Sequence, residues 1–177
     1  MTDDEINQLA KLLGKLEPGF VPYPIFEQAL RIFAMPVYEV VPLRLNDQDE
    51  IEVLLIDRGP EDPIWPNMLH TPGTIIRSTD VPDDTTHNQQ ALKRITDDEL
   101  KGTPVSEPHY FGSMLHKSKR GVEQAQLHWV EVLGEPVTGT FHPVDNLPST
   151  LIDSQVTVID KAVRNFGGYK EGLNASL

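Results

Sequence analysis

Three acidic residues stand together near the middle of the chain, in the stretch "ALKRITDDELKG" at positions 91–102. Asp97, Asp98 and Glu99 follow Arg94 by about one helical turn. Adjacent carboxylates repel one another, so a chain tolerates them on a solvated helix end or uses them to hold a cation. Acids near a helix C-terminus also face the negative end of the helix dipole. This cost favours a functional reason, and the solvated helix end stays open as the alternative.

The helical spacing of this stretch puts positions 95, 98 and 99 on one face, because residues three and four apart are neighbours. Asp98 and Glu99 contribute hard oxygen donors to that face. Ile95 carries an aliphatic side chain that can neither bind a cation nor accept a proton. We therefore expect a face with two donor positions and one inert position.

The composition restricts the classes of partner. The formal net charge of -12 argues against a nucleic-acid backbone or an anionic membrane. A small anionic ligand stays open if a divalent metal reverses the local sign. The chain has no cysteine, which excludes disulfides and zinc–thiolate sites. Positions 1–19 lack a long apolar run, so we expect neither a secretory signal nor a membrane span. We therefore expect a cytoplasmic location.

A length of 177 residues fits one domain with an extension. We place an N-terminal helical extension at 1–35 and the domain at 36–177. Thr2 and Glu5 fit a capping box, and an apolar stripe at helical spacing follows them. A second helix is expected over 24–33. Both helices would pack against the domain or against a second copy of the chain. The second arrangement predicts a homodimer through the N-terminal helices.

From position 36 the apolar pattern becomes that of strands. Strands are expected at 37–45, 51–58, 109–116 and 126–133, with helices from 84–86 to Leu100 and from Ile152 to Phe166, the last one ended by Gly167 and Gly168. Strands, a helix, more strands and a helix indicate a mixed α/β or α+β sandwich.

This order of features resembles the Nudix hydrolase fold. Positions 51–74 resemble the strand, loop, tryptophan and Pro-Gly turn before the signature helix of that family. Positions 91–102 resemble the helix itself, and 139–163 resemble the usual close of the domain. The resemblance covers 36–168 and implies an α+β fold, an α/β/α sandwich with a mixed sheet.

The signature of the family is written GX5EX7REUXEEXGU, where U is a bulky aliphatic residue. Placing Arg94 on the arginine puts Asp98 and Glu99 on the paired glutamates. Ile95 then replaces the glutamate after the arginine, and Thr86 replaces the earlier one. The signature in this chain is degenerate.

The resemblance implies a divalent metal, Mg2+ or Mn2+, that neutralises a diphosphate and activates water. Asp98 and Glu99 would hold it, with Asp97 and Glu135 as further candidate ligands. The carbonyl of Gly73, in the glycine turn before the helix, would assist.

The resemblance also implies roles for two arginines. Arg94 is a candidate catalytic residue together with Asp98 and Glu99. The resemblance implies that it orients the loop before the helix, and it could form an ion pair with Asp97 or Asp98. Arg58 follows a strand at a position where the family often faces the substrate, so Arg58 and Gly73 are the candidate substrate-binding residues.

Two further features have an ordinary structural interpretation that we favour. Lys117, Lys119 and Arg120 form the only basic cluster, which is typical of a charged hairpin tip and could also contact phosphate. Trp65 could stack on a base, but large aromatic residues are more often buried anchors.

The sequence supports three hypotheses. The first is a divergent Nudix-type hydrolase, a metal-dependent pyrophosphatase that cleaves the diphosphate bond of a nucleoside diphosphate linked to another group. The second is a catalytically inactive Nudix-fold domain that binds a nucleotide or a protein partner. The third is a structural dimer formed by the N-terminal helices. The fold favours an enzyme, and Ile95 and Thr86 favour loss of catalysis.

Overall fold

The computed structural model describes residues 1–80 and 87–174, so Thr86 and the predicted start of its helix lie outside the described residues. The elements are α1 (Asp3–Leu13), α2 (Tyr23–Ile32), β1 (Met35–Leu45), β2 (Ile51–Asp57), β3 (Leu69–His70), β4 (Gly73–Ile75), the 3-10 turn η1 (Ser78–Asp80), α3 (His87–Arg94), the π-helical turn η2 (Ile95–Glu99), β5 (His109–Lys117), β6 (Val122–Glu131), β7 (Thr140–Pro143) and α4 (Asp153–Asn174).

The strands form one mixed sheet in the order β3-β2-β1-β6-β5, with β4 added to β1 and β7 added to β2. β1 is parallel to β6 and antiparallel to β2. These two antiparallel strands pair only over Leu43–Leu45 and Ile51–Val53. Val37–Glu39 of β1 then pairs with β4, while the end of β2 pairs with β3. β1 and β2 therefore diverge, and the candidate site lies where they separate.

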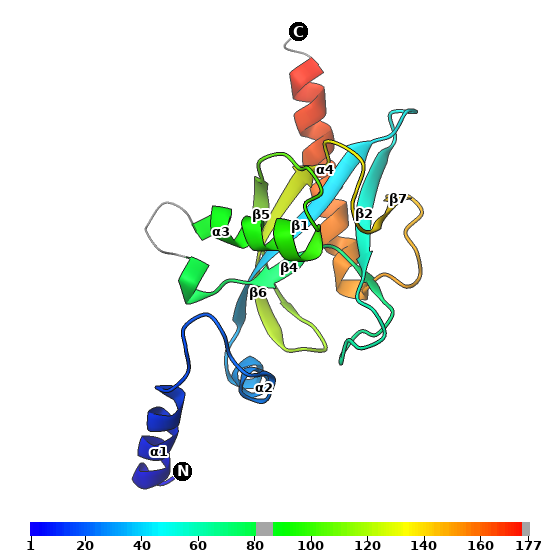
Figure 1. Ribbon diagram of the computed structural model, residues 1–177. Coiled ribbons are helices and arrows are strands. Elements are labelled where there is room, and N and C mark those ends of the chain that lie inside the picture. The colour runs from blue at the N-terminus through cyan, green and yellow to red at the C-terminus, as the bar shows by residue number, and fades with distance from the viewer. Residues whose placement is uncertain (81–86, 175–177) are drawn as a thin grey trace.

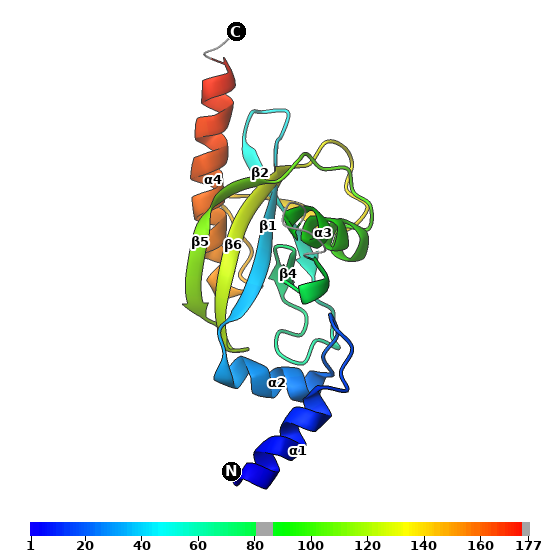
Figure 2. The same cartoon turned by 90° about the vertical axis from the view of Figure 1, so that its left-hand side faces the viewer.

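Each face of the sheet is covered by a helical layer, which confirms the predicted α+β sandwich (Figures 1 and 2). Side chains alternate across β1: Val41 and Leu43 join the core under α4, whereas Tyr38 and Val40 join the core under α3 and η2. Burial of a large apolar side chain contributes about 1.5–3 kcal/mol, so both layers are needed for stability.

Of the two helices of the N-terminal extension, only the second has a buried residue. The capping box predicted for Thr2 and Glu5 is present at the start of α1, but no residue of α1 is buried. This helix projects from the domain, so its predicted packing on the domain is wrong (Figures 1 and 2). In α2, Leu30 is buried against the β5–β6 hairpin. The predicted homodimer through these helices stays a prediction.

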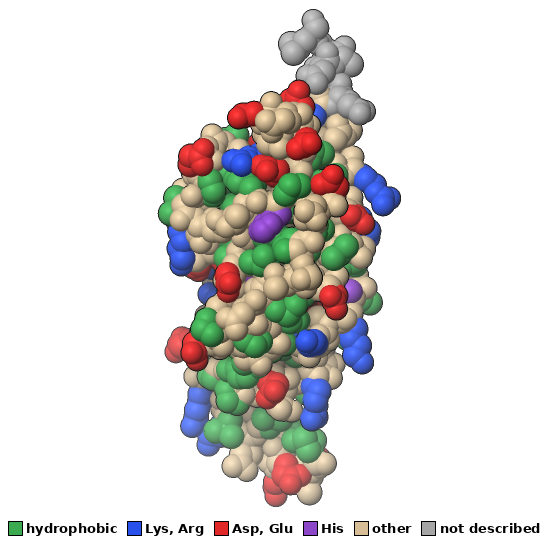
Figure 3. All heavy atoms as spheres, turned by 90° about the vertical axis from the view of Figure 1, so that its right-hand side faces the viewer, with side chains coloured by type: hydrophobic (Ala, Val, Ile, Leu, Met, Phe, Trp, Pro, Cys, Tyr) green, Lys and Arg blue, Asp and Glu red, His purple; other side chains and the backbone are tan. Residues whose placement is uncertain are grey.

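The surface at the N-terminal end of the molecule carries hydrophobic side chains among charged ones (lower part of Figure 3). The exposed apolar residues of α1 are Ile6, Leu9, Leu12 and Leu13. No helix among residues 1–80 and 87–174 is long and apolar enough to cross a bilayer.

The predicted end of the last helix at Gly167 and Gly168 is wrong, because α4 continues to Asn174. Each helical glycine costs about 0.5–1 kcal/mol relative to alanine. Contacts beyond the glycines offset this cost: the Tyr169 ring packs on Trp129, and an ion pair joins Lys170 to a β6 carboxylate at 2.6 Å. Tertiary contacts therefore carry the helix through a local stop signal.

Candidate active site

A pocket of about 420 Å³ opens where β1 and β2 diverge. The loop before β4, the turn η2, the β5–β6 hairpin and the first turn of α4 complete its walls. Its acidic lining residues are Glu39, Asp57, Asp62, Asp98, Glu99 and Glu123, and its basic ones are Arg58, Lys101 and Arg120. A site of this composition combines oxygen donors for a cation with guanidinium groups for an anion.

Glu39 and Glu123 are the two buried acids of the pocket. The position of Glu39 in β1 turns its side chain to the α4 face, where only 7% of the residue is exposed. Its carboxylate accepts hydrogen bonds from Thr71 Oγ1 at 2.9 Å and from Gln155 Nε2 at 2.8 Å. Burial raises the pKa of Glu39 to about 7, opposed by these two hydrogen bonds and assisted by nearby carboxylates. A carboxyl group with this pKa exchanges a proton near neutral pH.

Glu99 approaches the same point from the turn η2. Its Oε2 accepts a hydrogen bond from the backbone N–H of Gly73 at 3.3 Å. Burial raises the pKa of Glu99 to about 7, and the negative charge of Asp98 acts in the same direction. Glu99 also raises the pKa of Glu39, so the two carboxyl groups interact electrostatically.

Gly73 makes room for the carboxylate of Glu39. It pairs with Glu39 across β1 and β4. A Cβ atom at position 73 would stand 2.9 Å from Glu39 Oε2, closer than a Cβ atom is found to other atoms in proteins. The glycine predicted to bind substrate is therefore required here by the approach of a carboxylate.

The π-helical turn explains where Ile95 lies. The carbonyl of Ile95 accepts a hydrogen bond from Leu100, five residues on, at 2.9 Å. A π turn holds one extra residue and changes which side chains share a face. Ile95 is 1% exposed and belongs to the core with Tyr38. The expectation that Ile95 shares the pocket face with Asp98 and Glu99 is wrong.

Arg94 connects the signature helix to β4 and η1. Its guanidinium donates to Asp80 Oδ1 at 2.9 Å, to Thr74 Oγ1 at 2.6 Å and to the Ile75 carbonyl at 3.0 Å. Burial alone would raise the pKa of Asp80. Hydrogen bonds from Arg94 and from a backbone N–H have the larger, opposite effect, so the pKa of Asp80 lies below its ordinary value. The predicted pairing of Arg94 with Asp97 or Asp98 is wrong, because the buried acid at position 80 takes that place.

The structure thus brings together Arg58, Gly73, Asp98 and Glu99, four of the residues singled out in the sequence. Asp97 forms an ion pair with Lys93 on the outer side of the helix. Glu135 is exposed in the segment between β6 and β7. Neither Asp97, Glu135 nor Arg94 is among the residues that line the pocket.

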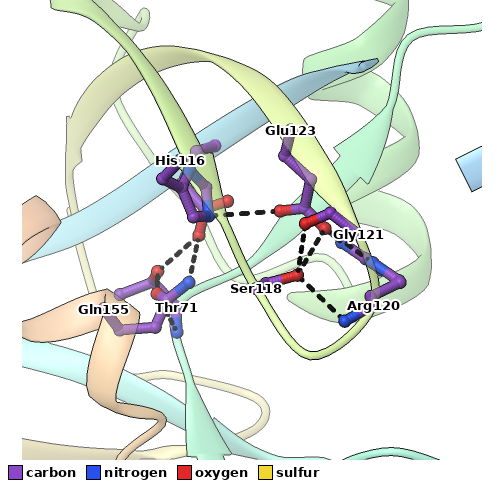
Figure 4. Close-up of polar contacts among 8 residues, drawn as sticks. Thr71, His116, Ser118, Arg120, Gly121, Glu123 and Gln155 are labelled. Carbon is purple, nitrogen blue, oxygen red and sulfur yellow. Dashed lines mark hydrogen bonds and ion pairs between the residues drawn. The ribbon is translucent and has the colours of Figure 1, made fainter. Parts of the chain in front are cut away.

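Glu123 was not found by reasoning from the sequence, which named its partner Arg120 only as part of a basic cluster. Its carboxylate accepts a hydrogen bond from Arg120 Nε at 2.7 Å and lies 3.3 Å from His116 Nε2. Figure 4 shows these side chains and Ser118 directed toward Glu123. Arg120 is half-buried and lines the pocket. The prediction that the basic cluster of Lys117, Lys119 and Arg120 is only a charged hairpin tip is therefore wrong for Arg120.

Trp65 fixes the basic wall of the pocket. It is 6% exposed, which confirms the buried anchor. The guanidinium carbons of Arg58 and Arg120 lie 5.4 and 5.6 Å from its ring centroid. Arg58 also pairs with Asp62 at 2.7 Å. Each guanidinium keeps further N–H groups that can bind a phosphate oxygen.

The fold has many relatives among solved structures. A C. elegans Ap4A hydrolase is 14% identical, with a TM-score of 0.54 over 77% of this chain and 98% of that chain. The Nudix domain of Shewanella oneidensis NrtR, solved with ADP ribose, is 15% identical, with a TM-score of 0.55 over 94% and 99%. A Nudix hydrolase from Alicyclobacillus acidocaldarius is 13% identical, with a TM-score of 0.55 over 72% and 90%.

These similarities show that the chain has the Nudix fold, as its sequence predicts. No model of a protein family matches the sequence, and no curated protein sequence matches it.

The donor set decides what kind of metal site the pocket can form. Among residues 1–80 and 87–174, no group of three or more histidine or acidic side chains is arranged to hold an ion. The hard oxygens of Asp98 and Glu99 fit a single cation that retains most of its water, as Mg2+ does. They do not fit a cluster of several metals.

Replacing Ile95 by glutamate tests the assignment of this residue to the core. Because the new carboxylate would be buried without a partner, Ile95→Glu should lower the free energy of unfolding by about 3 kcal/mol or more, measured by urea denaturation. Ile95→Val is the control and should cost about 0.5–1.5 kcal/mol. A stable Ile95→Glu protein with increased metal-dependent turnover would show instead that this side chain faces the pocket.

The raised pKa of Glu39 gives a second test. The folded state holds this proton more tightly than the unfolded state, so stability falls as pH rises from about 4.5 to about 7. Glu39→Gln should therefore be more stable than the native protein at pH 8 by about 1–3 kcal/mol and should match it near pH 4, where Glu39 is protonated in both states. Urea midpoints at both pH values measure this. The exposed control Glu61→Gln should change little, and equal stabilities of Glu39→Gln and native protein at pH 8 would contradict the burial argument.

Proposed function

We propose that the chain is a divalent-metal-dependent hydrolase that cleaves the diphosphate bond of a nucleoside diphosphate linked to another group. The observation that supports this most is the convergence of Glu39 and Glu99 on Gly73. Burial raises the pKa values of both groups, and the charge of Glu99 adds repulsion at Glu39, so two charged carboxylates here are unfavourable without a cation. A bound divalent ion would relieve this repulsion.

The cofactor in this proposal is one Mg2+ or Mn2+ ion held by Asp98 and Glu99, with water and substrate oxygens as its other ligands. When bound, it would supply neutralisation of the diphosphate charge and a lowered pKa for a bound water. Asp97 and Glu135, candidate ligands in the sequence, are left out because they do not line the pocket.

The protein groups around this ion would orient the substrate and move a proton. Arg58 and Arg120 would bind phosphate oxygens through their remaining N–H groups. Glu39, held by Thr71 and Gln155, has a pKa of about 7, suited to accepting the proton of the attacking water. Arg94 would act as a positioning residue, since its bonds to Asp80 and β4 hold the start of the turn that carries Glu99.

The substrate class follows from charge and from the similar folds. Phosphate groups match the guanidinium groups of the pocket, and a nucleotide derivative agrees with the Ap4A and ADP ribose named for two of the similar structures. We propose a small nucleoside diphosphate derivative as partner, and neither a nucleic-acid backbone nor a membrane, given the net charge of -12.

A second candidate function is a binding domain without catalysis. It is favoured by Ile95, which lies in the core where the family signature has an acid, and by the small number of donors for a metal. Such a domain would still bind a nucleotide in the same pocket, or a protein partner at its surface.

The assay that separates these functions follows release of phosphate or mononucleotide with Mg2+ or Mn2+ over a panel of diphosphate compounds. Glu99→Gln and Glu39→Gln should each lower kcat/KM by about 10²–10⁴-fold, since each removes a charge that holds the ion or accepts the proton. The matched control Asp97→Asn, two residues from Glu99 but outside the pocket, should retain activity within about threefold. In the native protein, turnover should rise from pH 6 to pH 8 as both carboxyl groups lose their protons.

Two results would contradict the hydrolase. Saturable nucleotide binding without turnover in the native protein would favour the binding domain. Turnover that survives Glu99→Gln and Glu39→Gln alike would place the reaction outside this pocket.

A further inference from the structure

A second pocket, of about 460 Å³, lies between the N-terminal extension and the domain. Its apolar lining residues are Phe20, Val21, Phe26, Met35, Ile75 and Ile76. Four of these come from the extension or its junction with β1, and two come from β4 and the residue after it. The volume is in the range of small-molecule sites in proteins.

The two pockets adjoin. Gly73 and Arg120 line both of them. The acidic pocket therefore lies on one side of this boundary and the apolar pocket on the other. A ligand that extends past Gly73 would have its charged part near Glu99 and its apolar part near Phe20.

The extension is fixed to the domain at both sides of the apolar pocket. At Gly19, where φ is +88°, a Cβ atom would stand 2.6 Å from Thr79 Oγ1 in the turn η1. At Gly121 a Cβ atom would stand 2.9 Å from the carbonyl of Leu30, which is buried in α2. Close approaches at these two glycines make the extension a wall of the pocket with a defined place, although α1 itself projects away (Figure 2).

The side chains of this second pocket indicate the chemistry of its occupant. Phe20 is 67% exposed, so most of its ring is free to contact a ligand. Arg77 and Arg120 also line this pocket and bring positive charge next to its apolar residues. A planar ring attached to an anionic group satisfies both features, through stacking on an aromatic side chain and through charge.

We infer that the N-terminal extension forms the base-binding half of the ligand site: the apolar pocket takes the aromatic ring of a nucleoside diphosphate whose phosphates lie in the acidic pocket. This inference rests on the proposed function for its ligand class, but not on turnover. It gives the extension a role in specificity that packing alone would not require. Loss of the ring contact should weaken binding of the nucleoside and leave binding of the bare diphosphate unchanged.

The test compares two ligands and two variants by calorimetry in the presence of Mg2+. The ligands are inorganic pyrophosphate and whichever of ADP, GDP, CDP and UDP the native protein binds most tightly. The double variant Phe20→Ala, Phe26→Ala should bind that nucleoside diphosphate at least tenfold more weakly and pyrophosphate within twofold of the native protein. The control Phe33→Ala removes an exposed ring of the extension that does not line the pocket, and should change neither affinity.

Three outcomes would overturn the inference. The native protein could bind pyrophosphate as tightly as every nucleoside diphosphate. The double variant could keep full affinity for the nucleoside diphosphate, or it could lose both ligands equally. If the ring discrimination is found and hydrolysis is not, only the catalytic part of the proposed function fails.

Discussion

The candidate site depends on the cost of holding two carboxylates, one buried and one half-buried, beside Gly73. Glu39 and Glu99 approach Gly73 from a strand and from a turn, and water is largely excluded around Glu39. Burial raises the pKa values of both acids to about 7, and the charge of Glu99 adds to the shift at Glu39, which costs folding free energy at neutral pH. A chain that keeps such a pair gains from it only if a cation or a proton transfer uses the charges. The cost is therefore the strongest physical argument for a site.

Other features of the fold serve to hold this pair in place. β1 and β2 separate after a short pairing, and β4 takes the place of β2 beside Glu39, which brings Gly73 opposite this acid. The π turn sends Ile95 into the core and leaves Asp98 and Glu99 at the pocket. Arg94 joins this helix to β4 through Asp80 and Thr74. Each contact fixes the approach of the two carboxylates to Gly73.

The sequence predicts the fold better than the site. Alternating apolar residues and the order of elements were enough for the sandwich, because they record which faces are buried. The site depends on features without a periodic signal. One extra residue in a π turn changed the role of Ile95, and Asp80, fourteen positions from Arg94, replaced the expected partner. Glu39 had a readable signal, a lone acid within the apolar run "VYEVV", where a buried charge requires a reason.

The most direct test of this account measures the protons released when Mn2+ binds. Calorimetric titrations at pH 7 in two buffers of different ionisation enthalpy give the number released per ion. With Glu39 and Glu99 both near half protonation, the account predicts saturable binding with release of about one proton, reduced in Glu99→Gln. The absence of binding, or binding without proton release and unchanged by Glu99→Gln, would contradict it.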